Sequence, residues 1–199
     1  MTHNVTALSK NITILNDNYF YKFGLWEMIS FLNNTPGQVK TVSRISSPAN
    51  IIFRKVVVSI NYTIPPSGSV PSQSSDMFSI DIPFFCDSLS INEIQAKLEK
   101  IISLSRIKLP EDRKKGFYQN IGAKRYLQLS SMENQVLYYV GKCYSPQSIA
   151  SILGCADKTV STHCRNAMRK MGTTKKSELY HYAAWVAQHT GRDRITLCL

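Results

Sequence analysis

Apolar residues follow two different patterns along the chain, and the change falls between residues 105 and 129. In the first part, apolar runs and periodic segments predict strands at 11–15, 39–43 and 55–60 and helices at 20–32, 48–53 and 90–103. The helix at 20–32 has an expected apolar face of Phe20, Phe23, Gly24, Leu25, Met28, Ile29 and Leu32. The alternation favours an α/β sheet, and the β-branched run 56–58 is typical of a buried parallel strand.

The second part is helical throughout, and its centre is the segment 157–172. The apolar stripe of this segment consists of Val160, Ala167, Met168 and Met171. Asp157 suits the helix start as a cap and as a negative charge, and Gly172 is a natural stop. The other faces are polar and mostly cationic, so the pattern predicts one amphipathic helix that can approach a surface closely.

A shorter helix precedes this amphipathic one. Ser145 is a candidate cap, Pro146 fits the first helical position, and residues 154–156 form a turn that contains a glycine. A helix, a short turn and a second helix with a cationic face together predict a helix-turn-helix. The alternative is a plain helical hairpin whose charged side is a solvated face.

Several motifs in this part occur together, in one register and without gaps. They are Leu129–Leu137, Ser145–Ala150 and Lys158–His163, followed by Asn166 and by Arg169–Gly172. Through residue 183 the sequence resembles the four-helix DNA-binding domain of LuxR/FixJ (NarL)-type bacterial transcription regulators. Ser161 stands where this family usually has lysine and Ala167 where it usually has isoleucine, departures that concern the DNA sequence preference.

The resemblance implies that the helix at 157–171 is a recognition helix that enters the major groove of promoter DNA. It places base-edge contacts at Ser161, Thr162 and Arg165, and phosphate contacts at Lys158, Thr159, Asn166, Lys170, Lys175 and Lys176. Arginine can bond two acceptors on guanine, whereas serine and threonine are less selective. Val160 is expected in the core, and His163 is expected to pack or to bond the backbone. No catalytic residue, phosphoacceptor, cofactor or metal site is expected.

Charge is distributed unevenly and supports this interpretation. Residues 1–102 carry 8 basic and 7 acidic side chains, residues 103–123 carry 5 and 2, and residues 124–199 carry 11 and 4. Most of the net charge of +11 therefore lies in the last part of the chain. A basic module attached to a nearly neutral one is typical of a polyanion-binding domain with a partner domain.

The first half resembles, more loosely, a response-regulator receiver domain. Residues 14–19 with 24–25 look like its first strand, acidic loop and first helix, and residues 82–84 with 90–103 look like its last strand and helix. Phosphorylation needs several carboxylates and a lysine. Of these, one acid is replaced by Asn16, the acceptor by Ser59 or Asn61, and the lysine by Ile82, while Asp17 survives. The Pro- and Ser-rich segment 62–76 predicts a flexible loop instead of further βα units. We expect a shortened, chemically silent receiver; the alternative is an unrelated small α/β domain.

The five cysteines are odd in number and lack paired C-x-x-C spacing, so neither a disulfide framework nor a zinc site is expected. His163, Cys164 and Cys155 lie inside the helix-turn-helix pattern, which favours packing over metal binding. Free thiols, a polar N-terminus and the lack of a long apolar run predict a cytoplasmic protein.

The expected organisation is a degenerate receiver-like domain at 1–105, a linker at 106–128 and a LuxR-type helix-turn-helix domain at 129–199. The expected function is phosphorylation-independent transcription regulation by a dimer. The alternatives are an auxiliary regulator that heterodimerises with another LuxR-type regulator, as in RcsA/RcsB-like and fimbrial regulators, and an ordinary phosphorylated response regulator.

Three surfaces are candidates for protein contacts. The stripe of the helix at 91–104 either packs on the sheet or forms a dimer face. The family places a dimer contact on the last helix, here 178–189, with Tyr180, His181 and Ala184 expected outside the core. The apolar tail 195–199 either packs back on the domain or forms a strand against a partner.

Overall fold

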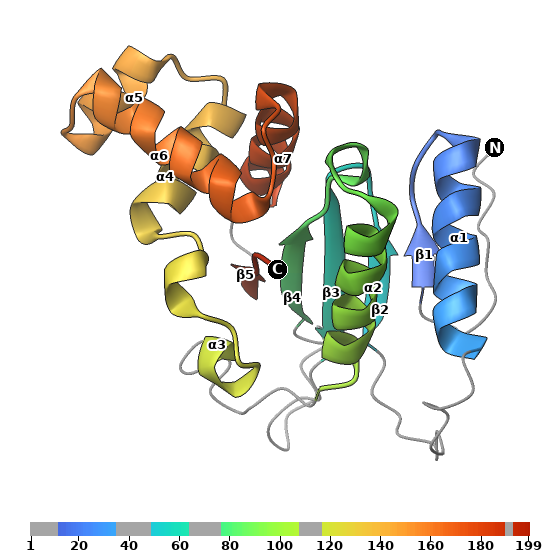
Figure 1. Cartoon of the computed structure of the whole chain (residues 1–199). Helices are drawn as coiled ribbons and strands as arrows, with labels where there is room; N and C mark the ends of the chain where they lie inside the picture. Colours follow the sequence, from blue (N-terminus) through green and yellow to red (C-terminus); the bar gives the residue numbers. More distant parts are fainter. Residues whose placement is uncertain (1–11, 35–48, 64–76, 108–116, 190–192) are drawn as a thin grey trace, which may run out of the picture.

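A mixed sheet lies at the centre of the computed structural model, which describes residues 12–34, 49–63, 77–107, 117–189 and 193–199 (Figure 1). Its strands in these residues are β1 (Ile12–Ile14), β2 (Asn50–Phe53), β3 (Val57–Thr63), β4 (Met77–Pro83) and β5 (Asp193–Thr196), in the order β1-β2-β3-β4-β5. The β1–β2 and β4–β5 pairs are parallel, and the β2–β3 and β3–β4 pairs are antiparallel.

The predicted fold class, an α/β half followed by an all-helical domain, is confirmed, but the sheet differs in detail from the sequence predictions. The run at 56–58 lies in or beside an antiparallel strand, so the sheet is not parallel, and its order differs from the 2-1-3-4-5 order of flavodoxin-like receivers. Residues 50–53 form β2, not a helix, because β1 and β3 hydrogen-bond to both of its edges. The strand predicted at 39–43 and most of the predicted loop lie outside the described residues.

Two helices, α1 (Tyr19–Asn34) and α2 (Ile91–Ser105), pack against the apolar core of the sheet. This core includes Leu25, Ile29, Ile60, Phe78, Ile80, Ile82, Phe84, Leu98, Ile101 and Leu104. The stripe of α2 therefore packs on the sheet, which was one of its two possible roles. The expected apolar face of α1 is only partly correct, because Phe20 and Phe23 are exposed.

The helical part consists of α4 (Ser131–Gly141), α5 (Pro146–Leu153), α6 (Asp157–Met171) and α7 (Lys176–Gln188). Ser130 and Glu133 form a capping box at the start of α4, and Ser145 caps α5 with Pro146 in its first turn, as predicted. Gly154 and Gly172 end α5 and α6 with φ values of 63° and 76°, in the left-handed region that glycine adopts without steric cost. The local signals in the sequence thus set the ends of these helices.

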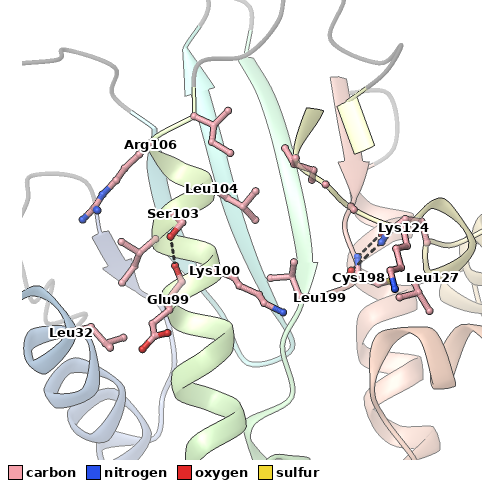
Figure 2. Close-up of a pocket in the computed structure, with 16 residues that line it drawn as sticks. Leu32, Glu99, Lys100, Ser103, Leu104, Arg106, Lys124, Leu127, Cys198 and Leu199 are labelled. Carbon is pink, nitrogen blue, oxygen red and sulfur yellow. Dashed lines mark hydrogen bonds between the residues drawn. The ribbon is translucent and has the colours of Figure 1, made fainter. Parts of the chain in front are cut away.

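Two buried residues, Phe117 and Gln128, anchor the chain between the two parts. Phe117, in the short α3 (Phe117–Asn120), is buried in the core of the sheet. Gln128 is buried and pairs with the backbone of Cys198, accepting from its N–H at 2.8 Å and donating to its carbonyl at 3.1 Å. Figure 2 shows this region, where a groove of about 800 Å³ separates Lys124, Leu127 and the C-terminus from α2.

The C-terminal tail completes the sheet of the first half. β5 pairs with β4, and Leu197, which follows it, is fully buried in the same core as α1 and α2. A second core joins the two halves, because Val57 and Phe85 pack there with Leu137 and Tyr182. The tail therefore packs back on its own chain. Among the described residues, no helix has the length and apolar character needed to cross a membrane.

Candidate nucleic-acid interface

The start of α6 follows the turn predicted from the sequence, with one correction. Ala156 is the N-cap and makes no side-chain cap bond, and Asp157 is the first helical residue, not the cap. The extended backbone falls on Ala156, so the carboxylate of Asp157 comes one position too late to cap. Its charge still lies in the first turn, where it favours the helix dipole.

The outer face of α6 exposes most of the residues that the resemblance assigns to DNA. Lys158, Thr159, Ser161, Thr162 and Arg165 are exposed, whereas Val160 is 2% exposed and anchors the helix in the core with Ile149. The Thr162 hydroxyl donates to the carbonyl of Lys158 at 2.8 Å, and Arg165 Nε donates to the carbonyl of Ser161 at 3.3 Å. Short polar side chains next to one long cationic side chain give a face that can approach a groove floor.

Two other residues of α6 are half-buried. Asn166 lies at the edge of the exposed face. His163 packs, and its Nδ1 is buried without a hydrogen-bond partner in the described part of the chain. The described residues also contain no group of three His, Cys, Asp or Glu side chains that could hold a metal ion.

Lys170 lies apart from the exposed cations, although the resemblance assigns it to phosphate. Its Nζ is 2.8 Å from Glu133 Oε2, and the two side chains are 14% and 5% exposed. Glu133 also accepts from the backbone N–H of Ser130 at 2.7 Å, so the lysine extends the capping box that starts α4. Spacing could not reveal this pair, because its members are 37 residues apart.

The two lysines before α7 have different surroundings. Lys175 turns toward the sheet half, where its Nζ donates to the carbonyl of Asp87 at 3.4 Å. Lys176 lines a groove of about 500 Å³ together with Ser161 and Arg165. The structure therefore brings Lys176 together with the exposed face of α6, while Lys175 faces the junction between the two halves.

The same groove is lined by two aromatic residues, Tyr144, which sequence reasoning missed, and Tyr180, which it placed on the surface of the last helix as a candidate dimer contact. Both are exposed. Tyr144 directly precedes the cap of α5, where a large exposed aromatic residue in a turn could have drawn attention. Tyr180 was expected outside the core, as were His181 and Ala184, and the burial of these residues agrees.

The ion pair of Glu133 predicts a dependence of stability on pH. Burial raises the pKa of Glu133, but the bonds from Lys170 and Ser130 outweigh it, so the pKa lies below its ordinary value. A depressed pKa in the folded state adds stability above the unfolded pKa, and this stability is lost as the pH falls through the folded pKa. We expect Glu133→Gln to lower the free energy of unfolding at neutral pH by about 1–3 kcal/mol.

Urea unfolding at a series of pH values measures this effect. The loss should shrink as the pH falls through the acid range. The control is Glu93→Gln in the capping box of α2, which has the same local bonds to Ser90 but is exposed, so that solvent screens its attraction to Lys97. A larger loss at Glu93 than at Glu133 would contradict the assignment.

α5 and α6 form a helix-turn-helix, and its second helix exposes a polar, cationic face. This geometry is typical of the helix-turn-helix class of DNA-binding proteins. Residues 127–183 match the model of bacterial regulatory proteins, luxR family (GerE), so this segment is a LuxR-family helix-turn-helix domain. No curated protein and no solved structure matches the chain. The match begins at residue 127, and the receiver-like interpretation of the first half has no such support.

Proposed function

We propose that this protein is a phosphorylation-independent transcription regulator that binds promoter DNA as a dimer through α6. The observation that carries the proposal is the exposed row of Lys158, Ser161, Thr162 and Arg165 on a LuxR-family domain. In this proposal Ser161, Thr162 and Arg165 contact base edges, and Lys158, Thr159 and Lys176 contact phosphates. Asn166 and Lys175 are secondary phosphate candidates, and Lys170 acts mainly through the fold.

Independence from phosphorylation is supported by the surroundings of the groups at the expected acceptor position. The Ser59 hydroxyl is buried and donates to Asp81 Oδ1 at 2.7 Å. Asp81 is in turn bonded to Arg194, so the carboxylate nearest to that position is already neutralised. Asp17 lies in the exposed loop after β1. A carboxylate held by an arginine is a poor acceptor for a phosphoryl group, which needs a free oxygen and a bound cation.

A single helix-turn-helix covers few base pairs, so a specific site needs two copies at spaced half-sites. The second candidate function is an auxiliary regulator that pairs with another LuxR-type regulator, and the exposed outer face of α7 around Tyr180 favours it. Gel shifts with purified protein alone, and with candidate partner regulators, separate the two functions. Specific binding by the protein alone supports the first, and binding only with a partner supports the second.

Arg165 provides the direct test of the DNA-binding face. If it reads a base edge, Arg165→Ala should weaken binding to a specific site by about 1–3 kcal/mol and affect random DNA far less. Fluorescence anisotropy on both DNAs at fixed salt measures the two losses. Arg169→Ala is a matched control, because Arg169 is an exposed arginine near the other end of α6. Equal losses on specific and random DNA would assign Arg165 to phosphate contact.

A further inference from the structure

The outer face of α1 exposes four aromatic side chains. Tyr19 is 72%, Phe20 84%, Phe23 54% and Phe31 63% exposed. They span about 18 Å of helix at about 1.5 Å per residue. We call these four residues the aromatic face. The opposite side of α1 contributes Leu25 and Ile29 to the core, so the helix is apolar on both sides. The fold of the monomer uses only one of these sides.

The aromatic face is remote from the DNA-binding face. In Figure 1, α1 and β1 lie at one end of the molecule, and α5 and α6 lie at the other. β1 is also the terminal strand of the sheet, so among the described residues it pairs with β2 alone. Exposed apolar patches of this kind mark sites of protein contact. A partner bound here leaves α6 open to DNA.

We propose that the aromatic face binds the same face of a second copy of this chain about a two-fold axis. The inference deepens the dimer of the proposed function by naming the surface that holds it. Its test needs no DNA, so it can fail while DNA binding stands, and the reverse also holds.

A two-fold axis suits this face, because it places the same four aromatic side chains on both sides of the contact. Gly24 follows Phe23 on the helix, and a Cβ there would meet no atom within 4 Å, so the helix surface is open at this point.

The area of the face is sufficient for a specific dimer. Aromatic side chains bury roughly 150–250 Å² each, and these four are more than half exposed, which gives about 500 Å² per copy. Two copies therefore bury about 1,000 Å² from these residues alone, near the lower limit for a specific interface. Leu15, which follows β1 and is also exposed, can add to this area.

The two other candidate dimer surfaces, on α2 and α7, expose fewer large apolar side chains than the aromatic face. Leu98, Ile101 and Leu104 of α2 are committed to the core, which leaves Ile91 as the large exposed apolar residue of that helix. On α7, Tyr180 is exposed, but its inward neighbours Leu179 and Tyr182 are buried. Ile91 and Tyr180 are therefore suitable control positions, because each is one exposed apolar side chain outside the aromatic face.

Sedimentation of the full-length chain over a range of concentrations tests the proposal. We expect the native protein to dimerise, and Phe20→Ser combined with Phe31→Ser to raise the dissociation constant of the dimer roughly 100-fold, because each change occurs twice. Ile91→Ser and Tyr180→Ser should leave the constant unchanged. A monomeric native protein, or a dimer that responds to Tyr180→Ser or Ile91→Ser and not to the Phe20 and Phe31 changes, would overturn the proposal.

Thermal unfolding of all these variants checks that the monomer is intact, so that a change in the dissociation constant reports on the contact itself.

Discussion

Replacing Asp81 with alanine is expected to lower the free energy of unfolding by about 3–5 kcal/mol, because it breaks a buried ion pair and leaves the cations behind. Asp81, in β4, is 6% exposed. It accepts from Arg194 Nε at 2.6 Å and from Nη2 at 2.5 Å, and from the hydroxyl of Ser59. This bidentate ion pair helps to hold β5, which contains Arg194, against β4.

A second arginine makes the loss larger than a simple pair would predict. Arg54 donates to Ser59 Oγ, and its guanidinium lies 4.4 Å from the ring centre of Trp185, with Arg194 at 5.3 Å from the same ring. Burial lowers the pKa of Arg54, the carboxylate of Asp81 raises it, and Arg194 lowers it. Without Asp81, two guanidinium groups share one partly buried site with no counter-charge in contact.

Urea unfolding followed by tryptophan fluorescence measures this loss, since the ring of Trp185, one of the two tryptophans, contacts both arginines. Asp87→Ala is the matched control, because Asp87 is an exposed aspartate shortly after β4 and should change the free energy by less than about 0.5 kcal/mol. The double variant Asp81→Leu with Arg194→Met removes both charges and should recover part of the stability. An unchanged stability of Asp81→Ala would show that water, and not Asp81, compensates the arginines.

Gly141→Ala is expected to destabilise the helical domain by about 3 kcal/mol or more and to abolish DNA binding with it. Gly141 is the last residue of α4, and a Cβ there would overlap the carbonyl group of Ala183 in α7 and come within 2.9 Å of the backbone N of Ala184. The obstructing atoms are backbone, so relief requires α7 to shift. Such a shift disturbs Leu179 and Tyr182, which fill the core beneath it.

Thermal unfolding and DNA binding of Gly141→Ala, measured together, test this expectation. Lys142→Ala is the control: the residue is next in the chain and exposed, and its ammonium lies 5.9 Å from the ring centre of Tyr138 on the surface. The control should be near native in both measurements. A native-like Gly141→Ala would mean that α4 and α7 can separate at little cost, contrary to the close packing described.

Local sequence signals were enough to predict the helical domain. Helix ends depend on a few neighbouring residues, so Ser145 and Pro146 predicted the start of α5, and Gly172 predicted the end of α6. The spacing of Val160 and Met171 likewise predicted the buried side of α6, because helical periodicity is a property of consecutive residues. The sequence therefore determined which residues of this helix face outward.

Tertiary structure decided what depends on distant partners. Residues 50–53 became a strand because β1 and β3 flank them, and β3 is antiparallel because pairing direction depends on the connections between strands. The tail packs on the first half because β5 pairs with β4 at the edge of the sheet and because Asp81 forms an ion pair with Arg194. On α1, which is apolar on both sides, periodicity cannot say which side meets the sheet. Packing buried Leu25 and Ile29 and left the aromatic face outside.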